Sequence, residues 1–229
     1  VKGQLVAQGE AAPEVRRGYE TVATRVATFE QQWAQSFPGV QASEVTVSDP
    51  RALEAPARLG MTFVVPRYAE AGGGLLRFFP FGASRTFTQA LAPLAQRRTD
   101  TVLPGVWVNR LRFTYRGPPG RTAPAVPPEV VEESPFGSLR LAARRDGARL
   151  LVEGTLTMKE SRVAAKDYPA FRAWLLKVDQ AFSTKLTLQR GNETAGAVFP
   201  RGTIGSGGGR PPDQEATASE PPAPWSLAN

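Results

Sequence analysis

The chain has 229 residues, a hydrophobic content of 41% and a formal net charge of +7. This composition is typical of an ordinary globular protein, and no apolar run approaches the roughly 20 residues that a membrane-spanning helix needs. Histidine and cysteine are both absent, which excludes catalytic triads built on an imidazole or a thiolate, disulfides, zinc ribbons and iron–sulfur sites. We therefore expect no enzyme of these kinds and no cofactor.

Arginine carries most of the positive charge, with 23 arginines against 5 lysines. A guanidinium group binds phosphate and carboxylate in a bidentate manner, so binding to a polyanion has to be considered. A GC-rich genome would also favour arginine, alanine, glycine and proline, and nucleic-acid-binding proteins usually concentrate their charge on one element. We favour the compositional explanation and keep polyanion binding as an alternative.

The first strongly periodic segment predicts a helix over residues 14–37. Pro13 suits a first helical turn, and Pro38-Gly39 would end the helix. The apolar residues are spaced by three and four positions and would form one stripe, which normally faces the protein's own core. These residues are Val15, Tyr19, Val22, Val26, Phe29 and Trp33.

A strand-rich region follows this helix. Apolar residues alternate with polar or small ones over residues 59–65 and again over 106–115, which is typical of strands that bury one face. The Gly72–Gly74 run lacks the features of a phosphate-binding loop and predicts a flexible connection. Asp146-Gly147 lies between two further alternating segments and predicts a hairpin.

Arginines crowd these strands and provide the one candidate binding site. Arg110 and Arg112 alternate with apolar residues, so they would share the polar face of a strand. An antiparallel sheet with one solvated face also explains this alternation without any ligand. Four more arginines lie around the predicted hairpin. The candidate anion contacts are Arg110, Arg112, Arg140, Arg144, Arg145 and Arg149.

A second helix is predicted over residues 168–183. Asp167 is a suitable N-cap and Pro169 fits the first turn. Asp179 falls on the opposite side from the apolar face, where solvent is expected. The apolar face consists of Phe171, Trp174, Leu175, Val178 and Phe182.

The composition changes sharply from Arg201 onward, where glycine, proline, alanine and serine dominate. Too few apolar residues remain there to offset the entropy of ordering, so residues 201–229 are predicted to be a disordered Gly/Pro-rich tail. Residues 1–200 are expected to be one β-rich domain, mainly β with the two amphipathic helices (an α+β fold), in an antiparallel β-sandwich-like arrangement. The alternative is two small α+β domains divided near Gly72–Gly74 or near Pro93.

The sequence nominates no catalytic residue and no metal ligand. Calcium-loop, Walker, GxSxG and SxxK spacings do not occur. Glu132 and Glu133 are adjacent, so in a strand they would point to opposite faces and could not form an acid/base pair. A carboxylate-dependent hydrolase remains an alternative, because two acids distant in the sequence can meet in a fold.

Several short motifs occur in an order that resembles a known family. The first group is Gly9, Ala11-Ala12, Arg16 or Arg17, Tyr19, Glu30 and Phe37-Pro38-Gly39. The second group is Arg97-Arg98-x-Asp100, Leu103-Pro104, Pro118-Pro119-Gly120 and Ser134-Pro135-Phe136-Gly137. The most specific is Lys166-Asp167-Tyr168-Pro169-Ala170-Phe171-Arg172 with Val178-Asp179. Over roughly residues 1–190 the chain resembles the C-terminal all-β domain of unknown function that follows the transglutaminase-like core in large bacterial transglutaminase-like proteins, typical of myxobacteria.

This resemblance implies a non-catalytic accessory or interaction module. The Cys-His-Asp triad of such proteins would lie in the papain-like core, and no residue of this chain corresponds to it. The implied partner is that core, within a longer polypeptide of which this chain, starting at Val1 without a methionine, would be a fragment. The resemblance also favours the cell envelope or periplasm. An Arg-rich module that binds an acidic polymer and a carboxylate-dependent hydrolase stay open as alternatives.

Overall fold

A computed structural model of the chain describes residues 1–82, 86–116, 121–122, 126–147 and 149–190. The tail predicted over 201–229 lies outside the described residues. The helices are α1 (Ala11–Gly18), α2 (Arg25–Trp33), α3 (Phe87–Leu91) and α4 (Tyr168–Phe182), with a 3-10 turn η1 (Val22–Thr24) ahead of α2. The strands are β1 (Lys2–Gly9), β2 (Gln41–Val47), β3 (Ala57–Val64), β4 (Glu70–Gly72), β5 (Leu75–Phe78), β6 (Thr101–Val102), β7 (Trp107–Arg116), β8 (Arg121–Thr122), β9 (Val130–Ser134), β10 (Gly137–Asp146), β11 (Arg149–Met158), β12 (Arg162–Val163) and β13 (Leu186–Arg190).

One large antiparallel sheet organises the fold. Its seven strands follow the order β2-β3-β1-β7-β11-β10-β9. The first strand of the chain lies near the middle, because β1 pairs with both β3 and β7. The sheet therefore joins strands that precede the Gly72–Gly74 loop to strands that follow Pro93, the two places at which the sequence leaves a division into two domains open. The predicted mainly-β, α+β class is confirmed.

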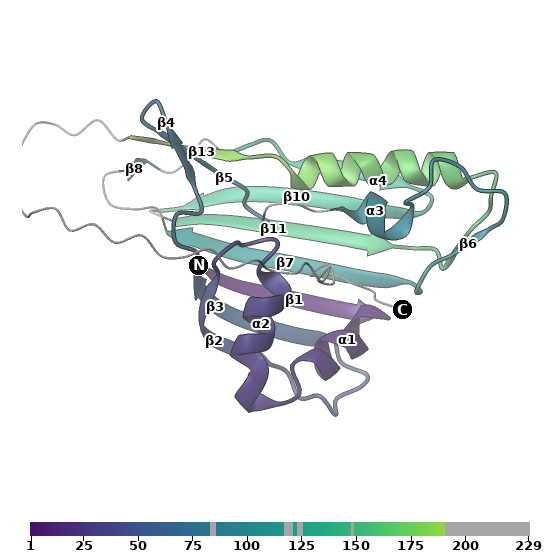
Figure 1. Cartoon of the computed structure of the whole chain (residues 1–229), viewed down its shortest axis with the longest axis horizontal. Coiled ribbons are helices and arrows are strands. Elements are labelled where there is room, and N and C mark those ends of the chain that lie inside the picture. Colours follow the sequence, from purple (N-terminus) through teal and green to yellow (C-terminus); the bar gives the residue numbers. More distant parts are fainter. Residues whose placement is uncertain (83–85, 117–120, 123–125, 148, 191–229) are drawn as a thin grey trace, which may run out of the picture.

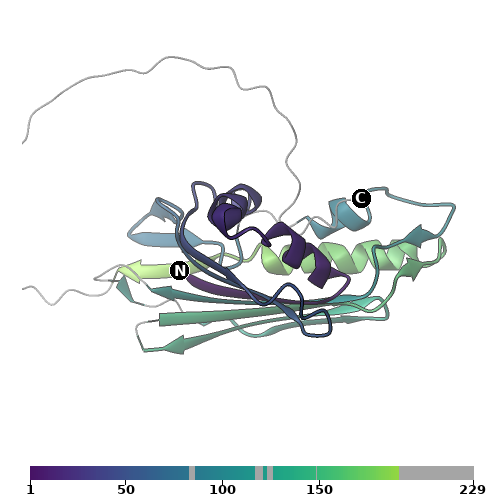
Figure 2. The same cartoon turned by 90° about the horizontal axis from the view of Figure 1, so that it is seen from below.

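The elements form two layers. All four helices lie on one side of the large sheet, together with the small sheet β4-β5-β13-β8, and none of the elements that the structure describes covers the other side (Figure 2). In Figure 1, α1 and α2 lie over the β1–β3 half of the sheet, and α3 and α4 lie over the β10–β11 half. The layer facing the large sheet thus combines helices with a small sheet.

Aromatic side chains fill the space between the layers. Trp33 stacks on Phe29 with ring centroids 5.2 Å apart and meets Phe113 of β7 edge-on at 6.0 Å. Phe37 packs against Phe63 of β3 at 5.2 Å. All five side chains are essentially inaccessible to solvent, and burying a side chain of this size stabilises the fold by about 1.5–3 kcal/mol. These contacts fix α2 on the sheet.

The single helix predicted over residues 14–37 is instead two helices joined by the 3-10 turn η1. The break follows Gly18, a residue with low helix propensity, and includes the β-branched Thr21 and Val22. Val22 was expected in the buried stripe but is 73% exposed. The break is held by Arg25, whose Nε donates to the carbonyl of Tyr19 at 2.6 Å.

Helix α4 begins and ends close to the predicted bounds. Asp167 occupies the N-cap position, yet its side chain makes no capping hydrogen bond. The prediction that Asp179 is solvated is wrong. Its carboxylate accepts the backbone N–H of Phe87 at 2.7 Å and of Thr88 at 3.0 Å, so it caps α3. Burial raises the pKa of Asp179 above its ordinary value, although these amide donors counter part of the shift.

Side chains also protect the two edges of the large sheet. At the β2 edge, the Glu30 carboxylate accepts the N–H of Ala42 at 2.8 Å, next to a register irregularity in that strand. At the other edge, Lys177 of α4 pairs with Glu132 of β9 at 3.5 Å. Such devices discourage pairing of an edge with another chain. Within the described part of the chain, no helix is both long and apolar enough to pass through a membrane.

Candidate interaction surface

We call the side of the large sheet that no described helix or strand covers the open face. Residues alternate between its two sides along each strand, and the cross-strand register assigns every position to one side. Polar and charged side chains predominate on the open face, as expected for the solvated side of an antiparallel sheet. Its positions in the six strands from β3 to β9 are Arg58, Gly60, Thr62, Val64, Lys2, Gln4, Val6, Gln8, Val108, Arg110, Arg112, Thr114, Arg116, Arg149, Leu151, Glu153, Thr155, Thr157, Ser138, Arg140, Ala142, Arg144, Asp146, Val131 and Glu133.

The structure brings five of the six candidate arginines to the open face. They come from three adjacent strands, β7, β10 and β11. Arg145 is the exception, because it lies opposite the buried Leu150 and therefore on the other side of the sheet. The five that share the open face are Arg110, Arg112, Arg140, Arg144 and Arg149.

Three of these five arginines already have partners within the chain. Arg112 donates from Nε to Glu153 on the neighbouring strand at 2.6 Å, and Arg140 pairs with Glu129. Arg110 donates to the side-chain oxygen of Gln8 at 3.0 Å. All three side chains are exposed, so solvent screens these contacts and they add little to the stability of the fold. The sheet therefore fixes where these guanidinium groups lie, while their contacts add little to its stability.

The open face also carries Arg58, Arg116 and Lys2, which the sequence patterns did not nominate. Arg116 continues the alternation that begins at Arg110, so parity along β7 could have identified it. Arg58 could be placed on this face only once the strand order was known, because β3 is separated from β7 by β1. Val6 of β1 lies opposite both Arg58 and Arg110, so these two arginines stand two strands apart, or about 10 Å.

Four of the cations gather at the end of the open face where β7 ends and β11 begins. We call Lys2, Arg116, Arg144 and Arg149 the basic corner. Arg116 and Arg149 lie directly opposite each other in the β7–β11 register. Lys2 faces Thr114, and Arg144 faces Leu151, which in turn faces Thr114, so both are diagonal neighbours of the pair.

The charges of the basic corner are poorly balanced within the chain. Asp146, opposite Arg149, is the nearest carboxylate by register, and four cations against one anion leave a formal charge of +3. None of the three arginines forms an ion pair with a residue that the structure describes. Like charges directly opposite each other destabilise a sheet, and Asp146 offers one carboxylate against two guanidinium groups, so a further anion beside the Arg116–Arg149 pair would stabilise it.

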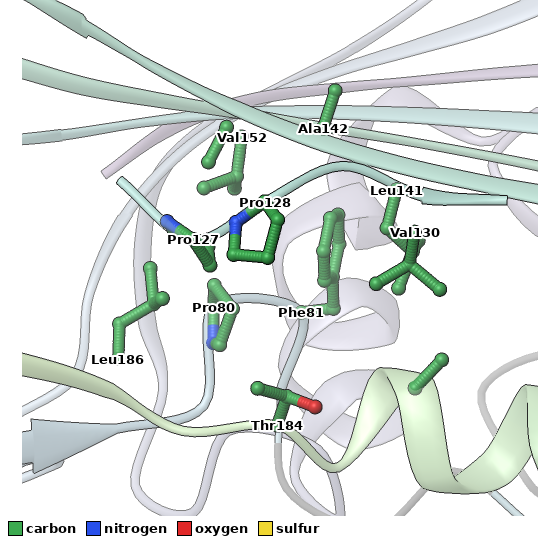
Figure 3. Close-up of a pocket in the computed structure, with 12 residues that line it drawn as sticks. Pro80, Phe81, Pro127, Pro128, Val130, Leu141, Ala142, Val152, Thr184 and Leu186 are labelled. Atoms are coloured by element: carbon green, nitrogen blue, oxygen red, sulfur yellow. The ribbon is translucent and has the colours of Figure 1, made fainter. Parts of the chain in front are cut away.

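A small apolar pocket lies on the opposite, covered side of the sheet (Figure 3). It contains about 410 Å³ of empty space, counted with its open mouth. Thr184 contributes the one hydroxyl of the lining, and Ala142 points away from the pocket in Figure 3. The other lining residues are Pro80, Phe81, Pro127, Pro128, Val130, Leu141, Ala143, Val152, Ala181 and Leu186. Catalytic and ligand sites need several convergent polar groups, which this lining does not supply.

The adjacent acidic residues Glu132 and Glu133 both form ion pairs with lysines. Glu132 pairs with Lys177 at 3.5 Å, and Glu133 pairs with Lys159 at 3.2 Å on the other side of the strand. Among the described residues, no group of three or more acidic side chains is arranged to hold a metal ion. The described part of the chain therefore presents a charged surface as its most developed candidate site.

Residues 76–188 match the family model DUF3858, described as a domain of unknown function with a solved structure. The match spans just under half of the chain. It runs from β5 to β13 and includes α3, α4 and the three strands that carry the arginines of the open face predicted from the sequence. The similarity to DUF3858 supports a domain of unknown function.

One solved structure is similar to part of the chain. It is the crystal structure of a "putative protease" from Parabacteroides distasonis ATCC 8503, with 17% sequence identity and a TM-score of 0.43. The similarity covers 52% of this chain and 24% of that protein, so the present chain matches about a quarter of its length. No curated protein matches the chain.

Proposed function

We propose that the chain is a non-catalytic accessory or interaction module of a larger bacterial transglutaminase-like polypeptide, and that it docks onto the catalytic core of that polypeptide. The observation that carries the proposal is the open face. One side of the large sheet is buried under helices, while the other presents a broad surface of arginine, threonine and glutamine side chains. A surface of this kind suits recognition of another surface better than the binding of a small substrate.

The lack of histidine and cysteine agrees with this role. If the chemistry belongs to a neighbouring domain, the accessory module needs neither a nucleophile nor a general base. The matched region, residues 76–188, includes the strands and the helix α4 that build one half of the sheet. The motif order that resembles the transglutaminase-associated domain extends the argument to β1, α1 and α2.

The experiment that tests the proposal begins with the reading frame upstream of Val1. A transglutaminase-like domain with a Cys-His-Asp triad is expected there. The parent polypeptide should turn over its acyl-transfer or peptide substrates, while the 229-residue chain alone should show no turnover. Turnover by the isolated chain, or an upstream region without such a domain, contradicts the proposal.

Binding to an acidic polymer is a second candidate function, favoured by the five predicted arginines that share the open face. Counterion release would make such binding steeply dependent on salt. Retention on a heparin column at about 150 mM salt, lost progressively at higher salt, is the expected result. Elution below that concentration excludes a specific polyanion-binding role.

A further inference from the structure

We propose that the basic corner is the docking site for an acidic surface of the folded domain that precedes this chain in the parent polypeptide. This inference rests on the proposed function and specifies which surface and which chemistry are used. The Arg116–Arg149 pair lies at its centre, with Lys2 and Arg144 as diagonal neighbours. A partner carboxylate placed between two opposed guanidinium groups would replace their mutual repulsion by charge-assisted hydrogen bonds.

The size of the open face fits a folded partner. Six strand spacings of about 4.8 Å and strands of about eight residues give a sheet face of roughly 800 Å². This plane is similar in extent to the roughly 800 Å² of accessible surface that each partner buries in a standard protein–protein interface, and the basic corner occupies one end of it. The face is also rich in arginine and contains few lysines, as protein interfaces are.

Two other occupants fit less well. A second copy of the chain, docked face to face, would bring together two copies of a surface that carries eight cations and three carboxylates in the six strands from β3 to β9, and like charges across an interface are strongly unfavourable. Single-stranded nucleic acid is usually bound by stacking on aromatic side chains, and none of the open-face positions given above is aromatic. Binding of an anionic polymer that needs no stacking is one of the outcomes that the experiment below distinguishes.

The position of the first residues strengthens the assignment. Lys2 belongs to the basic corner, and the N-terminus lies at the end of the sheet where β7 ends and β11 begins (Figure 1). A domain joined ahead of Val1 would therefore be tethered beside the corner. Tethering by a short linker raises the effective concentration of a partner into the millimolar range. The tethered domain would therefore bind the basic corner even if the electrostatic attraction is modest.

The test uses the parent polypeptide with a protease site inserted ahead of Val1. After cleavage, the dissociation constant between the two parts is measured by sedimentation at about 50 and 300 mM salt. The corner variant is Arg116→Glu/Arg149→Glu, and the control is Arg51→Glu/Arg98→Glu, which changes the net charge equally at two exposed loop residues. The corner variant should bind at least about 10-fold more weakly than wild type, while the control retains wild-type affinity. Circular dichroism verifies that both variants remain folded.

Each other outcome contradicts part of the account. If the parts associate and the corner variant binds like wild type, docking uses another surface, so the inference fails and the proposed function stands. Equal weakening in both variants indicates a general charge effect and also overturns the inference. If the wild-type parts do not associate, the proposed function fails together with the inference. Heparin binding lost only in the corner variant, without association of the parts, assigns the corner to an acidic polymer instead.

Discussion

Replacing Asp179 by alanine removes the cap that links α4 to α3. The carboxylate accepts two backbone N–H groups at 2.7 and 3.0 Å, and the donors belong to Phe87 and Thr88, which are both buried. Loss of an N-cap costs about 0.5–2 kcal/mol, and leaving buried donors unsatisfied costs about 1–3 kcal/mol. We expect Asp179→Ala to lower the free energy of unfolding by about 2 kcal/mol.

The pH dependence of this effect has a defined sign. Burial raises the pKa of Asp179 in the folded state, so the folded protein binds this proton more tightly than the unfolded chain does. The stability gained by protonation is fully present below the unfolded pKa of about 3.9 and is lost as pH rises through the folded pKa. The difference in stability between wild type and Asp179→Ala should therefore be larger at pH 4 than at pH 7.

The assay is urea denaturation followed by tryptophan fluorescence, with Trp174 on the same helix as Asp179. Asp167→Ala is the matched control, because Asp167 lies at the start of α4 and makes no capping hydrogen bond with its side chain. That variant should lose less than about 0.5 kcal/mol. Equal losses for the two variants, or a difference between wild type and Asp179→Ala that shrinks at pH 4, refute the reasoning.

Three further substitutions test other parts of the fold. Gly137→Ala should lower the free energy of unfolding by about 1–3 kcal/mol, measured by thermal denaturation, because an added Cβ would lie 2.2 Å from the carbonyl oxygen of Thr157. The control Gly72→Ala places its Cβ where nothing lies within 4 Å, so it should be nearly neutral. Arg16→Ala should lower the free energy of unfolding by about 1–3 kcal/mol, because the Arg16 guanidinium donates to the carbonyls of Ala52, Leu53 and Ala55 in the β2–β3 loop. Proteolysis of that loop should become faster, and an unchanged cleavage rate would show that Arg16 does not hold the loop in place. A double-mutant cycle on Arg112 and Glu153 should give a coupling of no more than about 1 kcal/mol, because both side chains are more than a third exposed; a larger coupling shows that the open face is not freely solvated.

Elements that are specified by neighbouring residues could be predicted from the sequence. The Asp146-Gly147 turn joins β10 and β11 as a hairpin, and the apolar spacing of α4 matches its buried face. The first helix was predicted too long because Tyr19, Phe29 and Trp33 are all buried, and their spacing fits one helix or two. The spacing of apolar residues indicates which residues face the core, but it does not indicate whether the helix is interrupted between them.

Features that depend on distant pairing could not be predicted. Asp179 meets α3 through residues 91 and 92 positions away in the sequence, and no local pattern carries that contact. The position of β1 between β3 and β7 is equally non-local. The arginines show both cases, because alternation along β7 predicts that Arg110 and Arg112 share a face, while the opposition of Arg116 and Arg149 requires the register of β7 with β11.

The most direct test of the central claim is arginine-specific labelling with phenylglyoxal, followed by peptide mass spectrometry, on the isolated chain and on the parent polypeptide. The basic corner should react in the isolated chain and become protected in the parent polypeptide, at Arg116, Arg144 and Arg149. The exposed loop residues Arg51 and Arg98 should react equally in both. Equal labelling of the basic corner in the two proteins would contradict the claim that this surface docks a partner domain.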